Sequence, residues 1–183
     1  ASIAWERRKV EEAAVESEKH FRTLYESVQA GVILQQADGT IVHVNRMACD
    51  VFGMTAESIQ GKTSGDPVWQ MILEDGTPVP GKDHPSMVTL RTGEPIRGAV
   101  RGLFSGDPSR LRWLMINTEP LRRGDDGGIE QVLITFHDIT ERKRAEEALR
   151  VSEERFRGVF QHAPAGIVIG SPDGLAVAVN PAF

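Results

Sequence analysis

The chain contains the beginning of one sequence pattern twice, and this repeat constrains its fold more than any other feature. Residues 17–22 (SEKHFR) return as residues 152–157 (SEERFR), and residues 30–34 (AGVIL) return as residues 165–169 (AGIVI). Each pair is separated by 135 positions, without an insertion. A spacing this long indicates a repeated domain with its leading helix, and not a short solenoid unit. The second copy stops at Phe183, so we expect the chain to be a piece of a longer protein with several domains.

The bulk composition is that of one ordinary domain with additional segments. The chain has 183 residues, of which 40% are hydrophobic and 26% charged, so a packed core is expected. The net charge of −5 argues against nucleic acid as a partner, because phosphate binding needs a concentrated basic face. The sequence lacks both a signal peptide and an apolar run of the ~18 residues that a membrane span needs. The single cysteine, Cys49, indicates a reducing compartment, so we expect a cytoplasmic fragment whose parent could still carry a membrane anchor.

Two charged segments are expected to form helices, one over residues 3–25 and one beginning near Thr140. In each, apolar or small residues recur at spacings of four and three, which is the seam of a coiled coil. The first seam is expected to form a parallel homodimer, and the second is its counterpart in the linker. The first seam consists of Val10, Ala14, Ser17, Phe21 and Leu24, and the second of Ala145, Leu149, Ser152, Phe156 and Val159.

Between these helices the pattern changes to alternation and turns, which predicts β-strands. We expect strands at residues 31–35, 40–44, 96–104, 111–121 and 129–138. Short helices are expected at residues 46–52, 56–59 and from Asp83 or His84 to residue 91. Residues 66–73 are expected to be a loop or a short helix, and residues 75–82 a loop rich in glycine and proline. Residues 164–183 are expected to form a lone hairpin. This order of elements gives an α+β domain.

Several short motifs in this order resemble those of PAS domains, which are sensory modules of signalling proteins. Residues 138–149 in particular resemble bacterial linkers that join one PAS domain to another or to a kinase. Each motif is short, and their order, spacing and repetition carry the resemblance. The motifs are Ser17-Glu18-x-x-Phe21-Arg22, Gly31-Val32, Asp38-Gly39-x-Ile41-x-x-x-Asn45, Arg112-Trp113 and Asp138-Ile139-Thr140.

The resemblance implies a five-stranded antiparallel sheet in the order 2-1-5-4-3, with short helices over one concave face. It also implies a ligand pocket on that face, a dimer formed by the flanking helices, and no catalysis within this fragment. The output enzyme, a histidine kinase of a two-component system or a diguanylate cyclase, would lie elsewhere in the parent. We expect an N-terminal signalling helix over residues 1–25, a sensor domain over 26–139, a linker helix over 140–163 and a truncated second PAS domain over 164–183.

Seven residues are candidates for contacts with a ligand, because the resemblance implies that the helix cluster and the long strands face the pocket. They are Trp69, His84, Met87, Arg101, Trp113, Met115 and Asn117. Each of them could equally be a core residue. His84 resembles the haem ligand of haem-binding PAS proteins, since imidazole is a normal axial ligand. Pro85 follows directly, however, so His84 is expected to cap the helix and face solvent.

The sequence therefore leaves three possibilities for a cofactor: none, haem or flavin. The cysteine signature of covalent flavin photochemistry is absent around Cys49. No phosphate-binding loop, nucleophile motif or metal-ligand spacing occurs either. The sequence supports a sensor without catalysis, and a haem- or flavin-binding redox or gas sensor is the alternative.

The junction between the last strand and the linker helix is the candidate for signal transmission. It consists of Asp138, Ile139 and Thr140. An acid at this position can accept hydrogen bonds from free N–H groups at the helix start, and Glu141 adds a favourable charge in the first turn. A shift of the last strand would then move the helix. The same three residues would also form an ordinary helix cap. A cap and a role in signal transmission are compatible, so both interpretations stay open.

Overall fold

The structure is a computed structural model that describes residues 25–105, 107, 109–123 and 128–182, together with residues 5, 8, 9, 16, 19, 20 and 23. The dimerisation residues expected from the sequence, namely Val10, Ala14, Ser17, Phe21 and Leu24, lie outside the described residues. The chain divides into two compact units, residues 1–139 and residues 140–183.

The first unit is built on one antiparallel sheet in the order β2-β1-β7-β6-β5-β3-β4. The five predicted strands form its first five positions in the expected order, which confirms the predicted α+β fold. The strands are β1 (Gly31–Gln36), β2 (Ile41–Val44), β3 (Trp69–Ile72), β4 (Pro78–Val79), β5 (Ile96–Ser105), β6 (Leu111–Arg123) and β7 (Ile129–Asp138).

Two strands that the sequence analysis did not predict extend the sheet beyond β5. The segment from Trp69 to Ile72 was expected to be a loop or a short helix, and it pairs with β5 instead. The predicted loop over residues 75–82 contains β4, which pairs with β3 around a turn at Gly76. A segment of four residues is too short to show the periodicity that distinguishes a strand from a helix. The segment from Trp69 to Ile72 becomes a strand because it pairs with β5.

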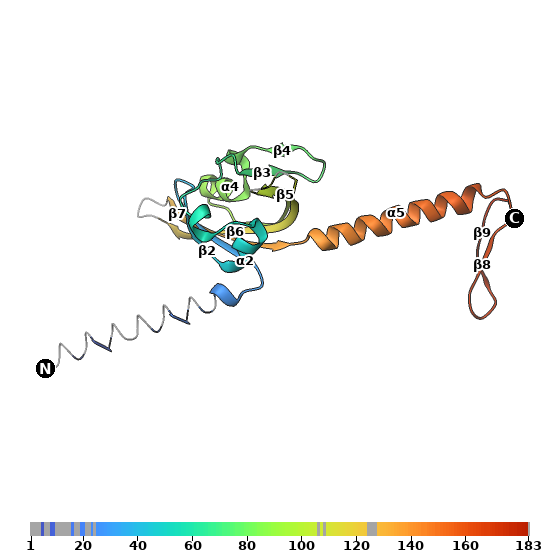
Figure 1. Ribbon diagram of the computed structural model, residues 1–183, viewed down its shortest axis with the longest axis horizontal. Coiled ribbons are helices and arrows are strands. Elements are labelled where there is room, and N and C mark those ends of the chain that lie inside the picture. The colour runs from blue at the N-terminus through green and yellow to red at the C-terminus, as the bar shows by residue number, and fades with distance from the viewer. Residues whose placement is uncertain are drawn as a thin grey trace. The chain divides into compact units, whose positions relative to one another are not determined.

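Short helices cover one face of this sheet (Figure 1). They are α2 (Arg46–Phe52), α3 (Ala56–Ile59), the 3₁₀ turn η1 (Gly81–Asp83) and α4 (Pro85–Thr92). The Asn45 side chain caps α2 by accepting from the Ala48 amide at 3.0 Å, and Thr55 caps α3. Helix α4 starts with Pro85, whose fixed φ suits a first turn, and ends at Gly93 with a φ of 79°.

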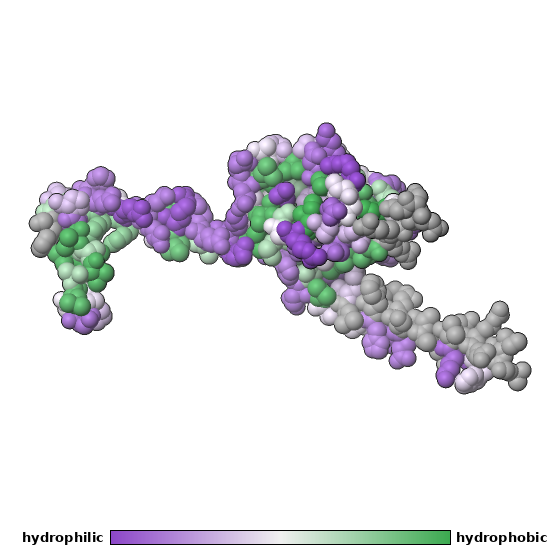
Figure 2. All heavy atoms as spheres, turned by 180° about the vertical axis from the view of Figure 1, so that it is seen from behind, coloured by the Kyte–Doolittle hydropathy of each residue, from purple (hydrophilic) through white to green (hydrophobic). Residues whose placement is uncertain are grey.

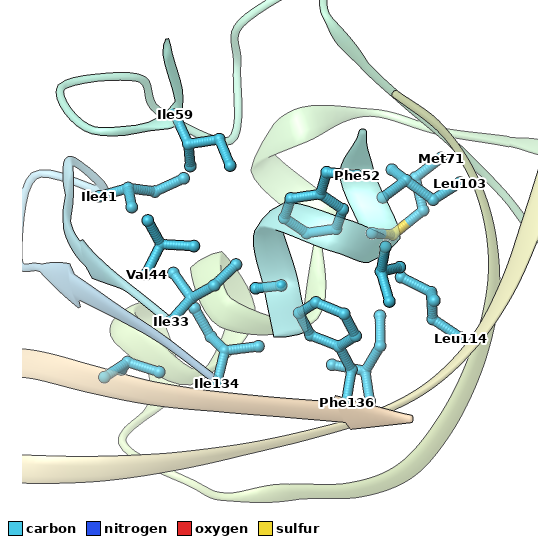
Figure 3. Close-up of a cluster of buried hydrophobic side chains, with 14 residues drawn as sticks. Ile33, Ile41, Val44, Phe52, Ile59, Met71, Leu103, Leu114, Ile134 and Phe136 are labelled. Carbon is cyan, nitrogen blue, oxygen red and sulfur yellow. The ribbon is translucent and has the colours of Figure 1, made fainter. Parts of the chain in front are cut away.

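The hydrophobic core lies between the sheet and these helices (Figure 3). Figure 3 shows Phe52 of α2 and Phe136 of β7 turned toward one another, and their ring centroids are 5.1 Å apart with the planes at 19°. Phe136 also stands directly over Gly31, which is its partner in the pairing of β1 with β7. The absence of a side chain at Gly31 therefore lets the ring reach the centre of the core.

The second unit consists of α5 (Thr140–His162) followed by the hairpin of β8 (Val168–Gly170) and β9 (Ala176–Val179). In helix α5, Arg150 forms ion pairs with Glu147 and Glu154. These residues are three and four positions away, which places the side chains on one face of the helix. The hairpin exposes much of its apolar surface, which Figure 2 shows as a green patch. Its exposed apolar residues are Val168, Leu175, Val177 and Val179.

Asn180 ties the hairpin together through the same hydrogen bonds that Asn45 makes in the first unit. The Asn180 amide group accepts from the Ile167 amide at 2.7 Å and donates to the Ala165 carbonyl at 3.0 Å. Asn45 accepts from Val32 at 2.9 Å and donates to Ala30 at 3.0 Å. Every partner in the second set lies 135 positions after its counterpart in the first.

Candidate functional site

A cavity of about 70 Å³ lies within the first unit, between the sheet and the helices. A single water molecule needs about 10 to 15 Å³ of such space, so the cavity has room for about five water-sized groups. Strands β1, β6 and β7 line its floor through Ile33, Leu114, Ile116, Ile134 and Phe136.

Aromatic rings form one wall of the cavity. Phe52 lies between Phe136 and Trp69, with its ring centroid 5.1 Å from that of each neighbour. Met71 and Leu103 extend this apolar wall from β3 and β5. The strand β3, which the sequence analysis did not predict, is therefore what carries Trp69 to the cavity.

Four polar residues also line the cavity and are called the polar wall here: Gln35, Ser64, His84 and Ser86. The Gln35 amide nitrogen donates to the Gly39 carbonyl at 2.9 Å and to the Ser64 hydroxyl at 3.1 Å. The Ser64 and Ser86 hydroxyl oxygens are 3.3 Å apart. This chain of hydrogen bonds joins β1 to the loop after α3 and to the first turn of α4.

His84 is buried in this wall, with 4% of its surface exposed. The expectation that it faces solvent is wrong, because His84 lines the cavity and forms a hydrogen bond with the backbone of Val79 in β4. Burial lowers the pKa of the imidazole, and the nearby Arg101 lowers it further, while a hydrogen bond with the Val79 backbone and the charge of Asp83 act in the other direction. The ring is therefore neutral at pH 7.

Of the seven candidate ligand contacts, Trp69 and His84 line the cavity. Trp113, Met115 and Asn117 lie on the other face of β6, because side chains alternate along a strand and Leu114 and Ile116 take the inward positions. The long strand is apolar on both faces, so alternation in the sequence did not reveal which face is covered.

The remaining two candidates, Met87 and Arg101, also lie outside the lining. Met87 follows Ser86 on α4, and its sulfur lies beside Gly39, at the turn between β1 and β2. Arg101 is on the inward face of β5, but its guanidinium donates to its own neighbour, the Val100 carbonyl, at 2.7 Å.

The sequence analysis missed the polar wall. Gln35 carried a usable signal, because it lies two positions after Ile33 on an apolar strand and so shares the inward face. Ser64 and Ser86 carried none, since they come from a loop and a helix start that only the folded chain brings together.

Strand β7, which lines the floor of the cavity, also leads to the junction with α5. Ile134, Phe136 and Asp138 alternate along β7, so they share one face. The Asp138 carboxylate pairs with the Arg112 guanidinium of β6 at 2.8 Å, and the two side chains are 22% and 26% exposed. The next amide, that of Ile139, donates to the Trp113 carbonyl at 2.8 Å.

No group of three or more metal-binding side chains occurs among residues that the structure describes. Within that same part of the chain, none of the helices is both long enough and apolar enough to cross a membrane.

An antiparallel sheet that encloses a small cavity beneath short helices, and whose last strand leads from that cavity to a helix, is the architecture of a sensory module. The chain belongs to the PAS fold family, which matches residues 25–144. PAS domains are sensory and non-catalytic, and are typical of signal-transduction proteins such as sensor kinases.

Known proteins agree with this assignment. Over 144 residues the chain is 26% identical to the sensor protein TdiS of Thauera aromatica, an alignment that covers 75% of this chain and 24% of the relative. The chain thus spans about a quarter of that relative's length. The PAS domain of an HTR-like protein from Haloarcula marismortui has a TM-score of 0.53 at 16% identity, covering 72% of this chain and 99% of that one. A PAS domain from Colwellia psychrerythraea has a TM-score of 0.52 at 15% identity, covering 67% and 97%.

Proposed function

We propose that the first unit senses a small molecule in its cavity and transmits the binding event along β7 to α5. The observation that carries this proposal is that Phe136 and Asp138 share one face of β7, two residues apart. Phe136 borders the cavity, and Asp138 holds the end of the strand to β6 through Arg112. A ligand that displaces Phe136 would also displace the point at which α5 begins.

Asp138, Ile139 and Thr140 are the transmission residues in this mechanism. The ion pair of Asp138 and the hydrogen bond that the Ile139 amide donates to the Trp113 carbonyl of β6 hold the strand end in one position. Thr140, which is 3% exposed, is the first residue of α5. Because only Ile139 separates the end of β7 from the start of α5, a change in the strand end would alter where the helix starts.

We expect Asp138→Ala to change the output of a full-length parent protein about two- to thirtyfold, the range that follows from typical coupling energies. The substitution should lower the free energy of unfolding by only about 1 kcal/mol, because the pair is partly exposed. Output is measured as the activity of the effector domain with and without stimulus, and stability by urea unfolding.

Glu119→Ala is the matched control, because it removes a comparable ion pair with Arg97, at 2.9 Å, away from the strand exit. It should leave the output unchanged. Equal output in the Asp138→Ala variant and the wild type would remove this junction from the mechanism.

We further propose that the protein forms a homodimer, in which α5 and the predicted N-terminal helix each pack against the same helix of the second copy. The support lies in the seam predicted on α5, whose Leu149, Phe156 and Val159 are 61%, 58% and 65% exposed. The rings of Phe156 and Phe160 stack 5.7 Å apart and widen this apolar stripe. A helix with a narrow apolar stripe and charged flanks is stable when it packs against a second one.

Replacing Leu149 and Phe156 together by serine should shift the protein from dimer toward monomer, because the two substitutions remove the largest apolar side chains of the seam. The measurement is sedimentation velocity over a range of protein concentrations. Val151→Ser is the control, since Val151 is 40% exposed and lies off the seam. A dimer that persists unchanged in the double variant would place the interface elsewhere.

Residues 164–183 are, in this proposal, the beginning of a second PAS domain. The support is the set of hydrogen bonds of Asn180, which repeats that of Asn45 at a constant spacing in the sequence. The output domain, a histidine kinase or a diguanylate cyclase, would lie elsewhere in the parent protein. The lone cysteine supports a cytoplasmic location.

The alternative of a haem or flavin sensor receives less support from this geometry. His84 does line the cavity, but about 70 Å³ is far below the 300 to 1,000 Å³ of typical ligand and cofactor sites. The cavity fits a molecule of a few heavy atoms.

A further inference from the structure

The surface of the cavity in the first unit is almost wholly apolar. Side chains from the sheet and from α2 are directed into the same space, as Figure 3 shows for Phe52, Leu114 and Phe136. Trp69 adds the carbon face of its indole, because its ring nitrogen has practically no surface that a water-sized group can reach. An occupant of the cavity therefore meets aliphatic and aromatic groups on most sides.

The polar wall does not change this apolar character, because its polar atoms are either bonded to one another or covered. The Gln35 amide nitrogen donates to the Gly39 carbonyl and to the Ser64 hydroxyl, which lies 3.3 Å from the Ser86 hydroxyl. Gln35 Oε1 and His84 Nε2 have practically no surface that a water-sized group can reach. These residues therefore present mainly carbon atoms to the cavity.

Water and ions are poor occupants of such a cavity. A buried water molecule needs about two to four polar partners, and the surface of this cavity offers almost none. Apolar cavities in protein cores stay dry for this reason and take up apolar guests. An ion is disfavoured more strongly. Among the described residues that line the cavity there is no Asp, Glu, Lys or Arg, so an ion would lose its hydration without compensation.

We propose that the ligand of this cavity is a small apolar molecule, a hydrocarbon of about four or five carbon atoms. A cavity of about 70 Å³ has room for about that many heavy atoms. An apolar guest leaves water and gains dispersion contacts with the rings of Phe52 and Phe136, and it needs no polar partner. This inference rests on the proposed sensory role of the cavity, and it names the class of ligand.

Three ring molecules of nearly equal size test the proposal: cyclopentane, tetrahydrofuran and pyrrolidine. They differ at one ring position, which is a CH₂ group, an ether oxygen or an amine that is protonated at neutral pH. Each is titrated into protein labelled with ¹³C at the isoleucine methyl groups. Cyclopentane should bind at least about tenfold more tightly than tetrahydrofuran, whose oxygen would lose its hydrogen bond with water, and pyrrolidine should bind more weakly still. The shifts should be largest at the isoleucines that line the cavity, which are Ile33, Ile41, Ile116 and Ile134.

A matched pair of variants locates the effect in the cavity. Ile134→Thr and Ile134→Val shorten the same lining side chain to the same shape, and only threonine adds a hydroxyl group. The affinity ratio of cyclopentane to tetrahydrofuran should be about three- to tenfold lower in the threonine variant than in the valine variant, because the hydroxyl can donate to the ether oxygen. Equal ratios in the two variants would place the binding site outside this cavity. The ranking of the three molecules on the wild-type protein does not depend on whether the threonine variant folds.

The outcomes separate this inference from the proposed function. If tetrahydrofuran or pyrrolidine binds as tightly as cyclopentane, the cavity still takes a ligand, but the apolar class is wrong. If none of the three shifts the lining methyl signals saturably, the inference is overturned together with the sensory role of the cavity. Transmission is followed at Ile139, which lies outside the lining and between β7 and α5. Bound cyclopentane that leaves the Ile139 signal unchanged would support the ligand class and contradict transmission along β7.

Discussion

Asn45→Ala is expected to lower the free energy of unfolding by about 3 to 5 kcal/mol, the largest effect of any single substitution considered for this chain. Asn45 is fully buried, and its side chain makes four hydrogen bonds. The oxygen accepts from the amides of Val32 and Ala48, and the nitrogen donates to the carbonyls of Tyr25 and Ala30. Alanine would remove these four hydrogen bonds to the backbone, including the one that caps α2.

Urea unfolding followed by circular dichroism measures this loss. Asn117→Ala is the control, because Asn117 makes one exposed hydrogen bond, in which its Oδ1 accepts from the Gly98 amide at 2.8 Å, and should cost less than about 1 kcal/mol. Asn45→Asp keeps an acceptor for the amides but sets a carboxylate against two carbonyls, so it should also be destabilising. A loss below about 1 kcal/mol for Asn45→Ala would mean that this network does not hold the domain together.

Gly31→Ala is expected to lower the free energy of unfolding by about 2 to 3 kcal/mol, through overpacking of the core. A Cβ atom on Gly31 would clash with the ring of Phe136, which is stacked on Phe52 and borders the cavity. Gly65→Ala is the matched control, since the nearest atom to its added Cβ would be Thr63 Oγ1 at 3.7 Å.

A double-mutant cycle tests the cause of this loss. In the background of Phe136→Leu, which shortens the side chain over Gly31, the alanine should cost less than about 1 kcal/mol, so that the two substitutions couple by about 2 kcal/mol. Additive effects would show that Phe136 is not what excludes a side chain at position 31.

Most of the fold could be predicted from local sequence patterns. Alternation and turn signals predicted the strands that begin at or next to Gly31, Ile41, Ile96, Leu111 and Ile129. The resemblance to PAS domains implied their order. Helices α2 and α3 were predicted with their bounds, because Gly53 ends the first and Thr55 caps the second. These signals act over a few residues, so they are readable in the chain itself.

The candidate site was less predictable, because cavity walls form between segments that are distant in sequence. Trp113 and Met115 were placed at the pocket, although Leu114 and Ile116 are the residues that face it. A strand that is apolar on both faces gives no sign of which face the helices cover. The placement of His84 failed for a related reason, since the strand β4, whose Val79 backbone forms a hydrogen bond with the imidazole, is too short to be recognised in advance.

The amino-acid order was sufficient to reveal the repeat, the turns, the caps and the family, because each of these depends on residue type at fixed spacing. Three features required the folded chain. They are the side that β6 turns toward the helices, the strand β3 that brings Trp69 to the cavity, and the meeting of Ser64 and Ser86 with Gln35. They depend on which surfaces meet when the core closes, and that is settled by the packing of the whole domain.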